Sequence, residues 1–215
     1  MDLMAVNLAY GIEKLLLIGG IITVSLIVAM YTTYAERKVA AWMQDRVGPN
    51  RAGPFGLLQP VADGLKLFFK EEIIPLTSNK TLFVLGPALA MVTAMLTSAV
   101  IPWGSSIEIF GRDVSLQIAD VNIGILYVFG VVSMGVYGIM IGGWASNNKF
   151  SLIGAIRASS QMISYEIAMG MAIIALVMST GTLSLKEIVM QQDAGLANIV
   201  YQPLGFLIFL VCAFA

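Results

Sequence analysis

Long apolar runs alternate with polar connections along this 215-residue chain. A bilayer core about 30 Å thick is crossed by about 20 helical residues, and four runs reach that length. A fifth run is too short to cross and stays apolar to the last residue, so we expect the sequence to stop inside its fifth helix. The predicted spans cover residues 15–35, 82–101, 121–143, 156–179 and, incompletely, 203–215.

These runs predict an all-α fold, a polytopic transmembrane helix bundle that forms one integral membrane domain over residues 1–215. The composition agrees, because 58% of the residues are hydrophobic and 12% are charged, whereas about a quarter are charged in soluble domains. Pro87, after Gly86, is expected to kink the second span. In the third span, Gly138 and Gly142 make a small-xxx-small pair that favours close approach of a neighbouring helix. We expect that span to serve packing alone.

Nearly half of the charged residues fall between residues 36 and 72. The first helix is expected to continue out of the membrane over the start of this stretch. The segment RVGPNRAGPFG, residues 46–56, contains two Gly-Pro pairs. Each proline fixes one φ angle and disfavours helical geometry at the residue before it. We therefore expect a compact, stiff loop from which Arg46 and Arg51 project.

A short amphipathic helix is predicted after this loop. Its polar residues fall at i, i+4, i+7 and i+11, which places them on one stripe. These residues are Gln59, Asp63, Lys66 and Lys70, and the opposite face carries Phe68 and Phe69. The stretch is either an ordinary positively charged loop with a membrane-surface helix, or the mouth of a cavity. In the second case an amphiphilic substrate leaves the bilayer past Phe55.

The basic residues predict the orientation of the chain. Nine of the 12 lie in or beside the first and third connections, which places those connections, including residues 36–81, in the cytoplasm and the N-terminus outside. The chain contains no histidine, and its one cysteine, Cys212, lies in an apolar run. The lack of histidine and the single cysteine argue against a haem, an iron–sulfur cluster or a metal site on this chain. No basic face suits nucleic acid.

Glu166 is the candidate for chemistry inside the membrane. It lies in the fourth predicted span, nine residues after Arg157, and the two side chains project from opposite faces of a straight helix. Inserting a carboxylate near mid-bilayer costs at least about 2.5 kcal/mol, so Glu166 needs another partner, a water-filled pocket or a proton. Arg157 lies near the cytoplasmic interface, where its side chain either snorkels or lines a site.

Two segments together resemble a known family: ERKVAAWMQDRVGPNRAGPFGLLQPVADGLKLFFKE, from residue 36, and GWASNNKFSLIGAIRASSQMISYEI, from residue 143. They are similar to the quinone-channel membrane subunits of respiratory complex I, the proton-pumping NADH:quinone oxidoreductase, a family that includes the bacterial and the mitochondrial forms of this subunit. The likeness extends over the whole chain in order and span pattern. It implies a non-redox subunit of a translocase, with no activity expected of the isolated chain.

The resemblance also implies roles for individual residues. Quinone is the implied substrate, and no haem, iron–sulfur cluster or flavin is bound by this chain. The implied quinone-chamber residues are Glu36, Arg37, Arg46, Phe55, Asp63 and Arg157. The implied proton path contains Glu166, Tyr165, Asp63 and Glu36. Docking or charge balance is assigned to Arg51, Lys66, Lys70 and Glu71.

The implied partners are the peripheral iron–sulfur and quinone-site subunits of complex I, the neighbouring membrane-arm subunits and membrane lipid. The implied location is the bacterial plasma membrane, in preference to an organelle's inner membrane. Two other functions stay open. One is the equivalent subunit of a membrane-bound hydrogenase, against which the intact DRVGPNRAGPFGLLQP motif argues. The other is an independent ion transporter, for which an acid in a span and a Gly-Pro break are typical.

Overall fold

The computed structural model describes residues 3–109, 112–193 and 195–214. Its internal contacts divide the chain into two units, Met1–Ile73 and Ile74–Ala215. Each unit is described by itself. The sequence predicts one domain and contains no linker signal. The division between the two units falls inside the charged connection and not at a composition change.

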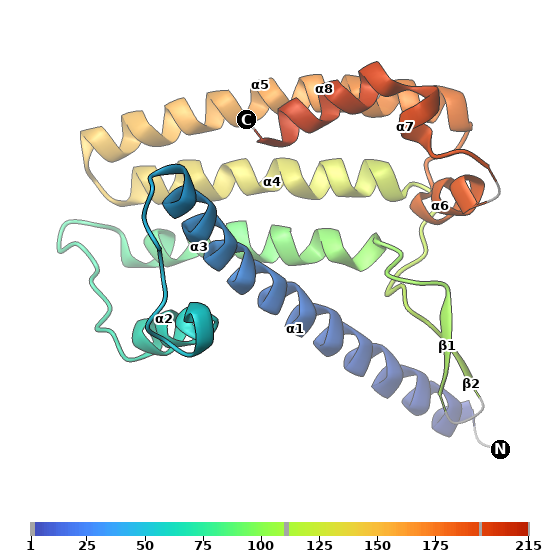
Figure 1. Ribbon diagram of the computed structural model, residues 1–215, viewed down its shortest axis with the longest axis horizontal. Helices are drawn as coiled ribbons and strands as arrows, with labels where there is room; N and C mark the ends of the chain where they lie inside the picture. The colour runs from blue at the N-terminus through green and yellow to red at the C-terminus, as the bar shows by residue number, and fades with distance from the viewer. Residues whose placement is uncertain (1–2, 110–111, 194, 215) are drawn as a thin grey trace. The chain divides into compact units, whose positions relative to one another are not determined.

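The first unit contains one long helix, a tight turn and one short helix (Figure 1). Helix α1, Leu3–Met43, includes the first predicted span and continues beyond it. A single 3₁₀ turn, η1, occupies Pro54–Gly56 in the middle of the Gly-Pro loop. Helix α2, Gln59–Phe68, lies where the polar stripe predicts an amphipathic helix, but it ends before Lys70, the last residue of that stripe. A proline at its start suits the first turn.

The second unit is a bundle with a small hairpin. Three long helices form its main body, and three shorter helices follow them. Its elements are α3 (Lys80–Thr97), η2 (Ser98–Val100), β1 (Ser106–Ile109), β2 (Arg112–Ser115), α4 (Gly124–Ala145), α5 (Lys149–Thr180), α6 (Leu185–Asp193), α7 (Asn198–Tyr201) and α8 (Pro203–Phe214).

Helix α4 lies between α3 and α5, and α8 packs along α5 (Figure 1). Backbone hydrogen bonds tie the ends of the antiparallel helices together. The Asn79 N–H, just before α3, donates to the Ala145 carbonyl at the end of α4 over 3.2 Å. At the other end, the Ile125 N–H donates to the Leu183 carbonyl, just after α5, over 3.0 Å. The three long helices therefore run antiparallel, with both ends of α4 held by their neighbours.

The glycine-rich third span makes the close contact that its spacing predicts, and the neighbour is α3. A Cβ atom added at Gly138 would lie 2.7 Å from the Gly86 carbonyl oxygen and 3.1 Å from the Ala90 nitrogen. A Cβ atom at Gly86 would lie 2.9 Å from the Gly138 carbonyl oxygen. Because neither position has room for a methyl group, the two backbones touch directly. Pro87 lies inside α3, next to this contact.

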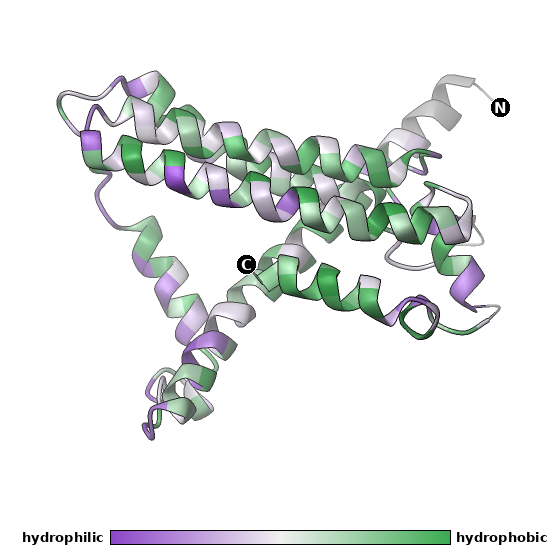
Figure 2. Ribbon diagram, turned by 90° about the horizontal axis from the view of Figure 1, so that it is seen from above, coloured by the Kyte–Doolittle hydropathy of each residue, from purple (hydrophilic) through white to green (hydrophobic). Residues whose placement is uncertain are grey.

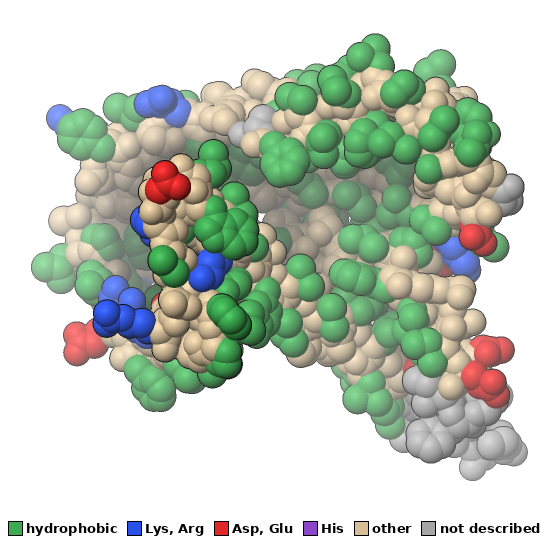
Figure 3. All heavy atoms as spheres, viewed as in Figure 1, with side chains coloured by type: hydrophobic (Ala, Val, Ile, Leu, Met, Phe, Trp, Pro, Cys, Tyr) green, Lys and Arg blue, Asp and Glu red, His purple; other side chains and the backbone are tan. Residues whose placement is uncertain are grey.

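The all-α polytopic fold class is confirmed. Among the described residues, four helices are long and apolar enough to cross a membrane, and α8 is a shorter apolar helix. Hydrophobic residues occur on all sides of the long helices (Figure 2), and hydrophobic side chains cover much of the outer surface (Figure 3). A bundle that exposes such a surface suits lipid as its solvent.

Two features differ from the sequence prediction. Helix α5 begins at Lys149, and not near residue 156, because the Asn148 side chain accepts a hydrogen bond from the Phe150 N–H over 2.9 Å and caps the helix. The antiparallel hairpin β1–β2, in which Ile107 pairs with Val114 and Glu108 with Asp113, was not predicted. Its alternating apolar and polar residues are the signal for a strand. The final residue of the predicted fifth span, 215, lies outside the described residues.

Candidate functional site

The charged loop of the first unit begins with a tightly closed helix end. The Arg46 N–H donates to the Ala41 carbonyl over 2.9 Å, and the Asp45 N–H donates to the Trp42 carbonyl over 3.3 Å. Asp45 has a φ of 52°, in the left-handed region. These features form a Schellman motif, which satisfies the last carbonyls of the helix. The chain therefore leaves α1 in a fixed direction, and Arg46 is exposed beside the end of the helix.

The Gly-Pro loop is compact because its backbone folds onto itself. Gly56 has a φ of 81°, and a Cβ atom there would lie 2.3 Å from the Pro49 carbonyl oxygen, so only glycine fits. Its neighbour Phe55 has a φ of 55°, which is uncommon for a bulky residue. The Tyr34 hydroxyl donates to the Phe55 carbonyl over 2.7 Å and ties this strained turn to α1.

An ion pair joins the two helices of the first unit. Arg37 on α1 donates to Asp63 on α2, and Gln59 donates to the other Asp63 oxygen over 3.1 Å. The Asp63 side chain is 29% exposed and that of Arg37 is 53% exposed. The hydrogen bond from Arg37, followed by the one from Gln59, lowers the pKa of Asp63 below its ordinary value of 3.8. Asp63 is therefore ionised at neutral pH.

Other predicted residues of this unit lie on its surface. Phe55 is 78% exposed, and Phe68 and Phe69 at the end of α2 are 88% and 87% exposed. Large aromatic side chains without cover in the first unit mark a surface that suits lipid, a partner or an amphiphile. The remaining charged residues predicted for the site are exposed as well: Glu36, Arg46, Arg51, Lys66, Lys70 and Glu71.

In the second unit, Glu166 lies opposite a hydroxyl group. Ser133 on α4 forms a short hydrogen bond with Glu166 on α5, and both side chains are partly buried. They line a cleft of about 610 Å³ between the two helices, together with Tyr137, Phe129 and other apolar residues. Among the described residues that line this cleft, none is basic. The acid thus has the partner that its position in a span requires, and the partner is uncharged.

The other two site residues predicted on α5, Tyr165 and Arg157, are not among the described residues that line this cleft. Tyr165 is half-buried at the adjacent position, and Arg157 is exposed. Glu166 bonds to Ser133 on α4. That Glu166 and Arg157 project from opposite faces of α5 stays a prediction.

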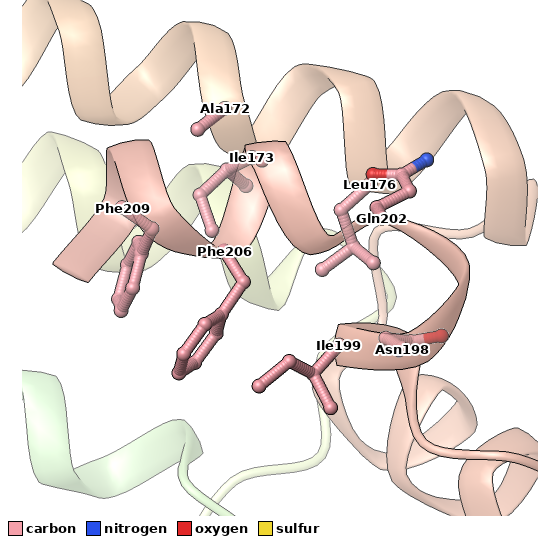
Figure 4. Close-up of a pocket in the computed structure, with 9 residues that line it drawn as sticks. Ala172, Ile173, Leu176, Asn198, Ile199, Gln202, Phe206 and Phe209 are labelled. Carbon is pink, nitrogen blue, oxygen red and sulfur yellow. The ribbon is translucent and has the colours of Figure 1, made fainter.

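A second cavity, of about 240 Å³, lies between α5 and the segment α7–α8 (Figure 4). Ile173 and Leu176 of α5 and Phe206 and Phe209 of α8 supply apolar walls. Asn198, at the start of α7, lines one end. No sequence pattern predicts this cavity. The described residues that line it include no charged residue, so charge spacing gives no signal for it.

Residues 16–215 match the sequence profile of one family, described as NADH dehydrogenase. The match covers most of α1, all of α2 and the whole bundle. The chain belongs to the NADH dehydrogenase family.

Several curated relatives carry more specific names, and each of them is an H-type subunit of NADH-quinone oxidoreductase. The chain is 68% identical over 212 residues to the relative from Cytophaga hutchinsonii, with 99% of the chain and 62% of the relative covered. It is 65% identical to the relative from Flavobacterium johnsoniae, covering 96% and 59%. It is 49% identical to a relative from Geobacter metallireducens, covering 96% and 62%. The chain thus spans about three fifths of the length of these relatives.

Three contacts in this NADH dehydrogenase family member were not predicted from the sequence. They are made by Ser133, Tyr34 and Gln59. The expectation that the third span serves packing alone is incomplete, because Ser133 on that span bonds to Glu166. The available signal was chemical: a carboxyl group in a span needs a polar partner, and Ser133 is the one serine among the glycines of the described helix α4. The chamber and proton-path roles of the individual residues stay predictions.

Proposed function

We propose that this chain is the quinone-channel part of a membrane-arm subunit of proton-translocating NADH:quinone oxidoreductase. It would form the quinone entry chamber and the start of the proton path. The observation that carries the proposal is 68% identity, over 99% of the chain, to a protein named as an H-type subunit of NADH-quinone oxidoreductase. The matched stretch includes both the loop and the spans, so the proposal does not depend on a single motif.

The first unit supplies the proposed quinone entrance. Its loop is stiff, and α2 presents Phe68 and Phe69 without cover, which suits a quinone that arrives from the hydrocarbon. On the opposite face of α2, the Arg37–Asp63 pair offers fixed charge and hydrogen-bond donors to a quinone head group. We assign Glu36, Arg46 and Arg157 to the chamber as well. Arg51, Lys66, Lys70 and Glu71 are assigned to docking or charge balance.

The second unit supplies the proposed proton step. Glu166 is an ionisable residue in a span, and its hydrogen-bond partner carries no charge. A carboxyl group with an uncharged partner can gain or lose a proton without breaking an ion pair, which suits a proton path. We assign Tyr165 to the same path because it adjoins Glu166 on α5. The resemblance also implies a path role for Glu36 and Asp63. We keep that assignment for Glu36, and we propose that Asp63 serves the quinone chamber instead, because its ion pair with Arg37 keeps it ionised.

The chain itself is proposed to carry no redox group. Electrons would reach quinone from iron–sulfur subunits of a peripheral arm, while neighbouring membrane subunits would receive the protons. The proposed location is the bacterial plasma membrane, with the N-terminus outside and the α1–α2 connection in the cytoplasm.

Purification of the full-length protein from its native membranes tests this proposal. We expect an affinity tag on it to recover a large complex that contains iron–sulfur clusters and reduces a soluble quinone with NADH. Deleting the gene should abolish inhibitor-sensitive NADH:quinone reductase activity of the membranes, and the tagged gene should restore it.

Two results would count against the assignment. Recovery of the protein alone, active in ion transport in vesicles, would favour an independent transporter. Recovery with a hydrogen-evolving complex that does not reduce quinone would favour the hydrogenase alternative.

A further inference from the structure

Ser133 has one hydroxyl hydrogen and two oxygen neighbours. Its Oγ atom lies 2.8 Å from the Phe129 carbonyl oxygen and forms a short hydrogen bond with Glu166 Oε1. A serine hydroxyl donates one hydrogen and accepts others. If Ser133 donates to Phe129, the hydrogen between Ser133 and Glu166 must come from the carboxyl group. Both contacts of the Ser133 oxygen carry a hydrogen at the same time only when Glu166 is protonated.

The bond to Phe129 is the ordinary state of a serine inside a helix. Ser164 on α5 makes the same bond to the carbonyl four residues earlier, also over 2.8 Å, with no acid involved. Within α4 the Phe129 carbonyl is positioned to accept the helical hydrogen bond from the Ser133 backbone N–H, so it does not depend on the Ser133 hydroxyl. The Ser133 hydroxyl is therefore free to rotate away from Phe129 at little cost.

The cleft around the pair has room for the exchange of a proton. Its volume of about 610 Å³ exceeds that of several water molecules, at roughly 30 Å³ each. Tyr137 is the other titratable residue that lines it. The remaining titratable side chains of the packed helices that the structure describes are Lys80 of α3, Tyr127 of α4, Lys149, Arg157 and Tyr165 of α5, and Cys212 of α8.

We propose that Ser133 is a positioning residue that supports Glu166 in both of its protonation states. With Glu166 protonated, the carboxyl O–H donates to Ser133, and Ser133 donates to the Phe129 carbonyl. When the carboxyl O–H bond breaks, the proton passes to water in the cleft, and the Ser133 O–H turns to donate to the carboxylate. The same hydroxyl thus accepts from the acid and donates to its conjugate base. This inference rests on the proposed proton path through Glu166.

Infrared difference spectroscopy of the assembled enzyme tests the pair directly. The C=O stretching band of a protonated carboxyl shifts with its hydrogen bonding, and Glu166→Gln identifies the band by removing it. We expect Ser133→Ala to move this band to higher frequency, because the acid loses its acceptor. Ser133→Thr keeps the hydroxyl and should restore the original frequency. Ser164→Ala, which removes an equivalent back-bonded hydroxyl from α5, should leave the band in place.

The outcomes separate this inference from the proposed function. A band that stays in place in Ser133→Ala overturns the inference. It is also overturned if Glu166→Gln removes no carboxyl band from the spectrum at neutral pH. A band that moves in Ser133→Ala and returns in Ser133→Thr supports it. If the band moves while proton translocation per NADH is unchanged in both Ser133→Ala and Glu166→Gln, the hydrogen-bonded pair stands and the proton path through Glu166 fails.

Discussion

Asp63 and Glu166 are both partly buried acids, but their partners differ in kind. Asp63 pairs with the Arg37 guanidinium and accepts a second hydrogen bond from Gln59. Glu166 bonds to the uncharged hydroxyl of Ser133, in a cleft whose described lining contains no basic residue. A fixed cation keeps a carboxylate ionised, whereas a hydroxyl accepts or donates as needed. We therefore propose that the partner of an acid, and not its position alone, decides whether it carries protons.

Different interactions fix the local geometry of each of the two regions. Around Asp63, polar contacts set the geometry: the Arg37 ion pair, the Schellman end of α1 and the Tyr34 hydrogen bond to Phe55. Around Glu166, the α3–α4 backbone contact at Gly86 and Gly138 helps to fix the helix that carries Ser133. Substitutions in the two regions should consequently fail in different ways.

The largest effect on folding is expected from Gly138→Ala. The new methyl group would lie 2.7 Å from the Gly86 carbonyl, so α3 and α4 must separate. Overpacking of this kind costs about 1–3 kcal/mol. Thermal unfolding of the purified full-length protein should show a lower midpoint and a lower yield of assembled enzyme. Gly130→Ala on the same helix is the matched control, because a Cβ atom there meets nothing within 4 Å. Equal unfolding of the two variants would show that the contact is not tight.

A smaller effect, on quinone kinetics, is expected from Asp63→Asn. Loss of the Arg37 pair should raise the KM for quinone by up to roughly fivefold, the range of a partly exposed ion pair. The control is Asp120→Asn, which breaks the Lys186–Asp120 pair of the second unit, 3.1 Å long, and should leave the KM unchanged. Equal KM values for Asp63→Asn and the unchanged protein would remove the chamber role.

The acid sensitivity of the same pair has a definite sign. Because the folded-state pKa of Asp63 is lowered, the pair stabilises the protein above the ordinary value of 3.8, and its contribution is lost as the pH falls through the lower folded-state value. We expect no activity change attributable to Asp63 from about pH 5 upward. Arg37→Gln should move the loss of stability toward higher pH in acid unfolding; an unmoved acid transition would contradict the assigned cause.

The smallest effect is expected from Tyr34→Phe. It removes the hydrogen bond to the Phe55 carbonyl, worth about 1 kcal/mol, and loosens the Gly-Pro loop without changing a charge. Hydrogen exchange over residues 46–56 should become faster. Tyr31→Phe, one turn earlier on α1, should not change it. If the two variants exchange alike, the Tyr34 contact does not stiffen the loop.

The sequence predicts this molecule best where the physics is local. Apolar run length predicts the spans, the two Gly-Pro pairs predict the compact turn, and the polar stripe predicts α2. The Ser133–Glu166 contact joins residues 33 apart, and it depends on how α4 and α5 align. Hydropathy does not encode that alignment. The Arg37–Asp63 contact could not be predicted either. It depends on the path of the loop between two helices, and the charges on those helices alone do not specify which residues pair.

The ratio of protons translocated to NADH oxidised tests the contrast between the two acids most directly. It should be measured in vesicles that contain the assembled enzyme, with Glu166→Gln and Asp63→Asn side by side and Glu108→Gln, an exposed acid of β1, as the control. We predict that Glu166→Gln lowers the ratio while assembly stays normal, and that Asp63→Asn slows quinone reduction but keeps the ratio. An unchanged ratio in Glu166→Gln, or an equal fall in both variants, would contradict the account.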